Sequence, residues 1–397
     1  SFQKMSYSSS RYSGGGGYGG GGGGQRGFGR YESSSSGGFR SSAYGSSFDT
    51  AELRKPVWDE STLTPFRKDF YREHPSVSAR SQAEIDAYMA EHRMSVEHPG
   101  GFRPVFAFCE ASFPDYIMST VRKLGFDTPT PIQAASWPIL LSGHDLVGIA
   151  QTGSGKTLAY ILPGIVQASH QDFSRPGDGP IILVLAPTRE LAQQIQTVAA
   201  EFGSNTQCRN CCIYGGAPKR QQLNEYQRGA EIVIGTPGRL IDFLSSGDVS
   251  LRRVTYLVLD EADRMLDMGF EPQIRKIVGQ IRPDRQTCMF SATWPHEVRK
   301  LANEFLSRAS YVTIGDRDLS ANHNITQIVE ICSEYDKDFK MKSVLYEIMK
   351  ERNSKTIVFA QTKRRVRDFH QMLSRLGFPV LDIHGDKKQY ERDRTLK

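Results

Sequence analysis

The stretch LVGIAQTGSGKT, residues 146–157, decides the fold. Its first four residues form an apolar β-rich run, and the glycine-rich part behind it opens a helical pattern, which is the context of a phosphate-binding loop. Glycines let backbone N–H groups curl around a phosphate, and the helix N-terminus adds positive potential. We predict that Lys156 reaches the β- and γ-phosphates of a nucleotide and that Thr157 holds Mg²⁺. The remaining loop residues are Ala150, Gln151, Thr152, Gly153, Ser154 and Gly155, with alanine where the common pattern has glycine.

A second apolar run, Tyr256–Leu259, leads directly into Asp260-Glu261-Ala262-Asp263. An apolar strand that ends in carboxylates is typical of the second half of a phosphate-loop site. Asp260 is predicted to coordinate Mg²⁺, partly through water, and Glu261 to orient and deprotonate the attacking water. A solvated acidic turn is the alternative, but the phosphate loop about 100 residues upstream favours the nucleotide site.

Apolar runs alternate with helical patterns from about residue 105 onward. The predicted strands are Leu146–Ile149, Ile181–Ala186, Ile232–Gly235, Tyr256–Leu259 and Thr287–Phe290, and the helices between them include Thr188–Phe202 and His296–Leu306. Continuous apolar strands separated by helices indicate a parallel sheet that is covered on both faces. The predicted fold class is therefore α/β.

The chain divides into five segments. We predict a disordered tail over 1–48, an N-terminal extension over 49–104, a first domain over 105–314, a linker over 315–325 and part of a second domain over 326–397. The extension holds a helix over Ser81–Met94 with a Ser-x-x-Glu capping box. The second domain repeats the pattern, with helices at Lys342–Arg352 and Lys363–Leu376 and strands at Thr356–Ala360 and Val380–Ile383.

Residues 1–48 contain 15 glycines and 14 serines with nine aromatic residues between them. Such a segment cannot bury enough apolar surface to offset its ordering entropy. It has five basic residues against one acidic residue, so most of the net charge of +6 lies there. It is either a flexible leader or an RGG-like arm, as in residues 26–31, whose arginines and aromatics can stack on bases and pair with phosphates.

The composition excludes some classes of protein. No apolar stretch approaches the ~18–20 residues of a membrane span, so we expect no membrane contact. No signal peptide is visible, and Met5 is the first methionine, so both ends are treated as open. Cys208, Cys211 and Cys212 cluster without a second pair or a histidine at ligand spacing, which favours reduced thiols over zinc.

The motifs in order resemble the DEAD-box RNA helicases over about residue 66 to the end. Asp260–Asp263 is the family's name-giving box, and residues 125–133 look like its Q motif, within 106–134, with Phe108 as the upstream aromatic. Ser291-Ala292-Thr293 resembles the motif that couples hydrolysis to strand separation. The tail and residues 70–75 look like the nuclear, glycine-rich, plant-like subgroup. The resemblance implies two RecA-like domains.

The resemblance also implies roles for individual residues. Phe126 would stack on adenine, Gln133 would bind its N6/N7 edge, and Thr128 and Asp263 would belong to the same nucleotide site. Catalysis would use Lys156, Asp260, Glu261, Ser291 and Thr293. The implied RNA-backbone contacts are Pro187, Thr188, Arg189, Gly215, Gly216, Thr236, Pro237, Gly238, Arg239 and, in the second domain, Gln361. These residues suit phosphates rather than base edges, so RNA binding should not depend on sequence.

The implied activity is ATP- and Mg²⁺-dependent unwinding of short RNA duplexes or remodelling of RNA–protein complexes by a monomer. An ATP-gated RNA clamp, an inactive RNA-binding fragment and a DNA helicase are the alternatives, the last disfavoured by the Q motif with the Asp260–Asp263 box. The family's arginine finger, typically worth ~10³–10⁵ in rate, would lie beyond residue 397, so we expect the chain as given to hydrolyse ATP poorly. The nucleus or nucleolus, with a role in ribosomal or messenger RNA metabolism, is the expected location, and the cytoplasm is the alternative.

Overall fold

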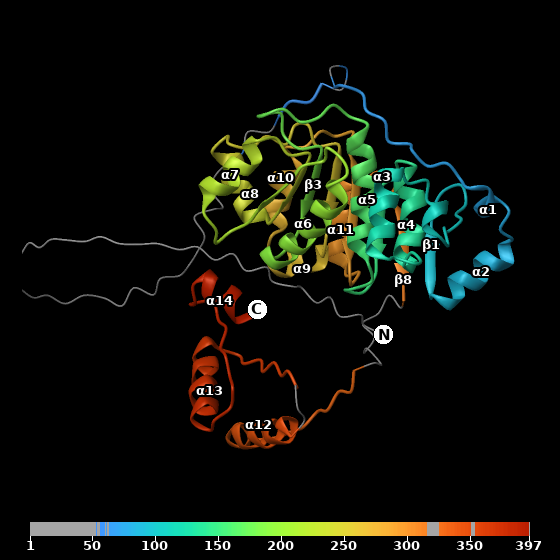
Figure 1. Ribbon diagram of the computed structural model, residues 1–397. Helices are drawn as coiled ribbons and strands as arrows, with labels where there is room; N and C mark the ends of the chain where they lie inside the picture. The colour runs from blue at the N-terminus through green and yellow to red at the C-terminus, as the bar shows by residue number, and fades with distance from the viewer. Residues whose placement is uncertain are drawn as a thin grey trace, which may run out of the picture. The chain divides into compact units, whose positions relative to one another are not determined.

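A computed structural model describes residues 53, 56–59, 61, 63–315, 325–350 and 354–396. The predicted tail, 1–48, and nearly all of the predicted linker, 315–325, lie outside these residues. Residues 63–315 form a three-layer α/β domain in which helices cover both faces of one sheet (Figure 1). No helix in the described part of the chain is long and apolar enough to span a membrane.

The sheet has eight strands in the order β1-β8-β2-β7-β6-β3-β5-β4. All neighbours are parallel except β1, which pairs antiparallel with β8 at the edge. Leu, Val and Ile make up most of β2, β3, β5 and β6, as expected for strands buried on both faces. The strands are β1 Met94–Glu97, β2 Leu146–Ile149, β3 Ile182–Leu185, β4 Asn210–Ile213, β5 Ile232–Gly235, β6 Tyr256–Leu259, β7 Gln286–Ser291 and β8 Ser310–Ile314.

Successive strand residues point to opposite faces, so the sheet organises two separate cores. Ile182 and Val184 belong to one, beneath the first group of helices, and Leu183 and Leu185 belong to the other. The first group is α3 Asp115–Leu124, α4 Pro131–Leu141, α5 Lys156–Ser169 and α6 Arg189–Gly203. The second is α7 Lys219–Gln227, α8 Pro237–Ser245, α9 Ala262–Asp267, α10 Glu271–Val278 and α11 His296–Phe305.

The N-terminal extension adds the short helix α1 Pro75–Ser78, helix α2 Gln82–Glu91 and strand β1 to the domain. The predicted capping box is present, because Ser81 and Glu84 bond each other's backbone N–H groups. The extension also supplies the antiparallel edge strand, which the sequence pattern did not predict. MSVE, residues 94–97, is too short and too polar to stand out as a strand until β8 lies beside it.

The five predicted strands of the first domain are confirmed as β2, β3, β5, β6 and β7. The prediction missed β4 and β8. The β4 strand begins with Asn210, a weak strand former, its apolar run is short, and it pairs with β5. Cys208, Cys211 and Cys212 are buried free thiols, and burial raises the pKa of Cys212 to about 12.

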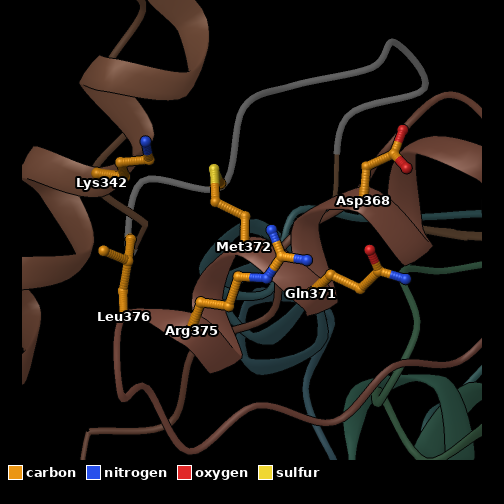
Figure 2. A pocket seen from close by; sticks show the side chains of 6 residues that line it. All are labelled: Lys342, Asp368, Gln371, Met372, Arg375 and Leu376. Atoms are coloured by element: carbon orange, nitrogen blue, oxygen red, sulfur yellow. The ribbon is translucent and has the colours of Figure 1, made fainter.

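The described part of the second unit, taken by itself, has three helices: α12 Glu334–Met349, α13 Lys363–Arg375 and α14 Gln389–Leu396. The strands predicted at 356–360 and 380–383 are wrong for this structure, since neither stretch pairs as a strand in the described part of the chain. A strand forms only where a partner supplies the ladder. Phe359 is accordingly 91% exposed. A hollow of about 320 Å³ between α12 and α13, lined by Lys342, Arg375 and four neighbours, contains no motif residue (Figure 2).

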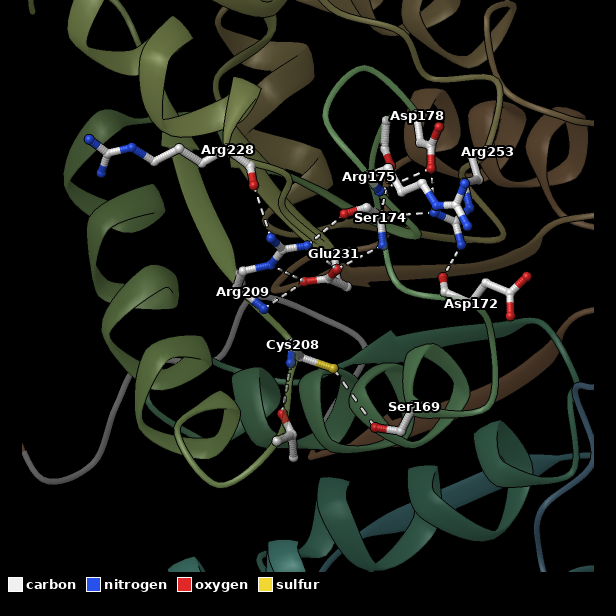
Figure 3. A network of polar contacts seen from close by, with 12 residues as sticks. Ser169, Asp172, Ser174, Arg175, Asp178, Cys208, Arg209, Arg228, Glu231 and Arg253 are labelled. Atoms are coloured by element: carbon white, nitrogen blue, oxygen red, sulfur yellow. Dashed lines mark hydrogen bonds and ion pairs between the residues drawn. The ribbon is translucent and has the colours of Figure 1, made fainter.

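A buried carboxylate ties together the edge of the sheet where β4 and β5 begin (Figure 3). Glu231, fully buried, accepts bonds from the Ser174 N–H at 2.9 Å and from the Arg209 guanidinium at 2.8 Å. Arg209 also donates to the Ser174 and Arg228 carbonyls. Burial alone would raise the pKa of Glu231, but these donors hold that pKa below its usual value.

Glu231→Gln is expected to lower the free energy of unfolding at pH 7 by roughly 2 kcal/mol, because Arg209 loses its charged partner. The depressed pKa of Glu231 means that its contribution is complete above the unfolded pKa and disappears as the pH falls through the folded pKa. The variant should therefore lose less stability than the wild type as the pH falls from about 5 to about 3, because the loss begins only near the ordinary glutamate pKa. Urea unfolding across this range measures the effect, with the exposed Glu91→Gln as control. Parallel curves for wild type and variant would contradict it.

Candidate functional site

Apart from the Q motif, the motif residues of the first domain follow the carboxyl ends of six neighbouring strands, so the sheet brings them to one edge. The phosphate loop follows β2, Ser291 ends β7, and Asp260 follows β6. Thr188 stands three residues beyond β3, and Thr236 directly follows β5. Gly215 and Gly216 follow β4. In spatial order, the predicted nucleotide residues therefore occupy β2, β7 and β6, and the predicted RNA residues occupy β3, β5 and β4.

The phosphate loop is shaped by glycines with positive φ. Gly153 has φ +79° and Gly155, the residue before α5, has φ +90°. A Cβ on Gly155 would lie 2.5 Å from the Gln133 amide, so only glycine fits there. Lys156 is 7% exposed and donates to the Ala150 carbonyl at 2.7 Å and the Gln151 carbonyl at 3.1 Å. Burial lowers the pKa of Lys156, while Asp260, Glu261 and Asp263 act to raise it.

The residues of the phosphate loop and its surroundings fit a nucleoside triphosphate. The Ser154 hydroxyl inside the loop and the Thr130 hydroxyl beside it are buried and have no hydrogen-bond partner in the described structure. Buried polar atoms are rarely left unpaired, and phosphate oxygens are acceptors for such donors. Gln151 and Thr152 are exposed in the loop, and Thr157 lies one residue behind Lys156 in the first turn of α5.

Gln133 connects the Q motif to the phosphate loop. Its Nε2 donates to the Gly155 carbonyl at 3.0 Å, and its Oε1 accepts from the Thr130 N–H at 3.1 Å. One N–H and one lone pair of this amide remain for a base edge. Phe126 is 42% exposed, and its ring lies 6.4 Å from that of the buried Phe108 at an interplanar angle of 17°. An exposed aromatic face supported from behind suits stacking on a base.

Tyr160 is a site residue that the sequence interpretation missed. It lies one turn beyond Lys156 on α5, is fully buried, and its hydroxyl donates to Asp260 Oδ2 at 2.8 Å. Burial raises the pKa of Asp260 to about 6, and the bonds from Tyr160 and the charge of Lys156 act against this rise. The available signal was the spacing of four residues from Lys156, which puts both side chains on one helix face.

Tyr160→Phe is expected to weaken Mg²⁺-dependent nucleotide binding by about fivefold to tenfold, because a charged carboxylate loses a buried donor that orients it. Binding of ADP in EDTA should hardly change, since the phosphates are held by the loop. Titration of a fluorescent ADP analogue with and without Mg²⁺ measures both. Tyr116→Phe, on α3, is the matched control. An equal loss under both conditions would show general damage to the domain and contradict the assignment.

Glu261 has a strained backbone, with φ +53° and ψ 52° immediately before α9. Left-handed backbone is uncommon for glutamate, and such strain gathers at functional sites. Its carboxylate is held by Arg264 at 3.3 Å. The neighbouring Asp263 accepts bonds from the Thr293 N–H at 2.9 Å and from the Thr293 hydroxyl at 2.7 Å, and its own N–H donates to Ser291 Oγ at 3.3 Å. The Asp260–Asp263 box is thereby joined to the Ser291–Thr293 motif.

The other half of the edge offers hydroxyls, open glycines and guanidinium groups. Thr188 caps α6 by accepting from the Leu191 N–H. The Arg189 guanidinium lies 5.0 Å from the Tyr214 ring centroid. Gly215 has no neighbour that would meet an added Cβ, and Gly216 has φ +80°. These features leave backbone N–H groups accessible, as phosphate contacts require.

Arg239 lies in the first turn of α8, after Thr236, Pro237 and Gly238. It is less available for contact with RNA phosphates than an exposed arginine would be. Its side chain is 9% exposed, donates to the Ala217 carbonyl at 3.0 Å and lies 3.7 Å from Asp242. It therefore holds the loop that carries Gly215 and Gly216, and much of its charge is offset. Pro187 stands two residues beyond β3, and Gln361 is exposed before α13 in the second unit, which is described by itself. The structure therefore groups the strand-end residues of the first domain at one edge and joins Gln133 to them through Gly155, whereas Phe126 and Thr128 lie in the segment between α3 and α4.

Fold and site together define a RecA-like P-loop domain, with hydroxyls, open glycines and guanidinium groups farther along the same sheet edge. The chain matches the family model "DEAD/DEAH box helicase" over residues 130–301 and the model "Helicase conserved C-terminal domain" over residues 339–397. It is similar to the ATP-dependent RNA helicase dbp2 of Aspergillus clavatus, with 58% identity over 87% of this chain and 63% of that protein. The protein of the same name from Ajellomyces capsulatus is also 58% identical and has 64% of its length covered.

Solved structures agree with these matches. The RNA helicase Prp28 from Chaetomium thermophilum, bound to ADP, is 34% identical with a TM-score of 0.56, over 86% of this chain and 78% of that one. The yeast DEAD-box splicing factor Prp28 is 29% identical with a TM-score of 0.60, over 81% and 74%. The chain belongs to the DEAD-box helicase family. It spans a little under two thirds of the length of the curated relatives named above.

Proposed function

We propose that the protein is an ATP-dependent RNA helicase, which binds the RNA backbone without sequence preference and unwinds short duplexes or remodels RNA–protein complexes. The observation that carries the proposal is the spatial order of the strands. Nucleotide residues on β2, β7 and β6 continue directly into phosphate-binding residues on β3, β5 and β4. At ~4.8 Å per strand, the five steps from β2 to β4 cover ~24 Å, which accommodates a nucleotide and several nucleotides of single strand.

The nucleotide half performs the chemistry in this proposal. The glycine loop and Lys156 hold the phosphate chain, and Phe126 with Gln133 holds the base. A Mg²⁺ ion held by Thr157 and Asp260 would neutralise charge on the phosphates. Glu261 takes a proton from the attacking water, and its fixed left-handed backbone keeps the carboxylate at the end of β6. Tyr160 keeps Asp260 oriented at 2.8 Å.

The link from chemistry to RNA runs through Asp263 and Thr293 in this proposal. Two hydrogen bonds of 2.9 and 2.7 Å join these residues, so a shift of the Asp260–Asp263 box is passed to the end of β7. ATP and RNA then favour the same state of the enzyme, and each tightens binding of the other. The hydroxyls of Thr188 and Thr236 favour RNA over DNA through the 2′-OH. The proposed setting is ribosomal or messenger RNA metabolism in the nucleus, by a monomer that acts on ribonucleoproteins.

Strand displacement on a short RNA duplex by the full-length protein tests the proposal. Displacement with ATP, none without nucleotide, and loss of displacement in Thr293→Val with ATPase retained are the expected results. Thr313→Val, on β8 outside the motifs, is the matched control. If the protein holds RNA with a non-hydrolysable ATP analogue but displaces no strand with ATP, it is an RNA clamp and the helicase proposal is wrong.

A further inference from the structure

A groove of about 820 Å³ lies at the opposite edge of the same sheet. Its walls come from segments that precede strands: residues 170–178 before β3, Arg252 and Arg253 before β6, and Arg282 before β7. The amino ends of parallel strands lie opposite their carboxyl ends, and four-residue strands separate the two edges by roughly 13 Å. The groove is therefore distinct from the nucleotide and RNA residues described above. The extension closes its remaining side with Trp58 and residues 63–67.

The groove is basic, and its charge is only partly offset. Five arginines line it against two aspartates. Arg253 lies 3.6 Å from Asp178 and bonds the loop, as Figure 3 shows, and Arg282 is held by Asp284 at 2.6 Å. In the described structure the exposed guanidinium groups of Arg175 and Arg252 have neither an ion pair nor a hydrogen bond. Arg253 and Arg282 thus fix the walls, Arg67 donates to the Asp69 carbonyl, and Arg175 and Arg252 line the groove with charge that no neighbour offsets in the described structure.

Aromatic side chains stand between these charges. Phe173 is 43% exposed beside the groove, and Trp58 is half-buried in its wall. Phe66 is already covered, with the Arg282 guanidinium 4.9 Å and the Lys68 ammonium 5.2 Å from its ring centroid. Free arginines beside open aromatic faces match single-stranded nucleic acid, which stacks its bases and pairs its phosphates. An acidic peptide would use the charges but leave the exposed Phe173 unexplained.

We infer that this groove is a second single-stranded RNA-binding site, which anchors RNA without nucleotide and without sequence preference. The inference rests on the proposed function for the class of ligand, but on separate residues. Arg175 and Arg252 contact phosphates, and Phe173 and Trp58 stack on bases. Trp58 stands ten residues beyond the basic, aromatic segment 1–48 in the chain. In the described structure no hydrogen bond or ion pair joins a lining residue of the groove to the phosphate loop or to the Asp260–Asp263 box.

The test uses residues 1–397 and fluorescein-labelled oligo(U), followed by anisotropy in the absence of nucleotide. The double variant Arg175→Gln/Arg252→Gln should weaken binding about tenfold at low salt and reduce the slope of log K against log salt by ~1.4, since two phosphate contacts are lost. Arg122→Gln/Arg299→Gln removes the same charge from exposed sites elsewhere on the domain and should have no effect. Phe173→Ser should weaken binding about fivefold or more.

Cross-linking of 4-thiouridine RNA supplies a direct readout that binding by the tail cannot mask. Cross-links to Phe173 or Trp58 that disappear in the double variant are expected. The inference is overturned if cross-links fall only on the tail and the strand-end residues, or if both double variants bind RNA equally. It is also overturned if the groove residues bind poly-glutamate but not oligo(U). Intact ATP-dependent RNA binding with no groove effect refutes this site alone, whereas no RNA binding by any form refutes the proposed function as well.

Discussion

Replacing Glu261 by glutamine is expected to lower RNA-stimulated ATP hydrolysis by about 10²–10⁴-fold while leaving nucleotide binding intact. Glutamine keeps the size of the side chain and its bond to Arg264 but cannot accept a proton from water. The lesion should therefore appear in kcat, with little change in the affinity for ATP.

Steady-state ATPase of the full-length protein, with and without single-stranded RNA, measures this effect. Asp267→Asn is a matched control, since it removes an exposed carboxylate from the same helix, α9. RNA stimulation should persist in the control and vanish in Glu261→Gln. Turnover of Glu261→Gln within threefold of the wild type would show that another group takes the proton, and the assignment would fail.

Lys156→Ala is expected to weaken ADP binding by about 100-fold, because two charge-assisted contacts to the phosphates are lost. Lys156 bonds the Ala150 and Gln151 carbonyls, so its ammonium already lies inside the loop that would surround the phosphates. Its buried position, beside Asp260 and Glu261, also means that the substitution leaves nearby carboxylates without their cation. ATP hydrolysis should be lost together with binding.

Titration with a fluorescent ADP analogue measures the loss, and thermal unfolding without nucleotide shows whether the domain is still folded. Lys123→Ala, at the exposed end of α3, is the control for removal of one lysine. The interpretation predicts that added ADP raises the melting temperature of the wild type and of Lys123→Ala but not of Lys156→Ala. An unchanged ADP affinity in Lys156→Ala would show that the phosphate loop does not bind the nucleotide phosphates.

The agreement between sequence and structure is closest where the chemistry is local. The phosphate loop, the carboxylates after β6 and the capping box at Ser81 each depend on residues a few positions apart. Glycine spacing and side-chain type suffice to predict such features. Buried central strands such as β3 and β6 could also be predicted, because their apolar runs are continuous.

Only the tertiary structure decided which motifs are neighbours. In the chain, the residues after β3, β4 and β5 stand between the phosphate loop and Asp260. In the sheet, β2, β7 and β6 are neighbours, and β3, β5 and β4 form the other half. The bond from Tyr160 to Asp260 spans 100 residues, and the antiparallel strand β1 depends on β8, more than 200 residues away. Pairing over such distances depends on how whole faces pack, and no local pattern records it. The sequence by itself therefore determined which reactive and binding side chains the protein has. The packing of the sheet determined the order in which these side chains lie along its edge.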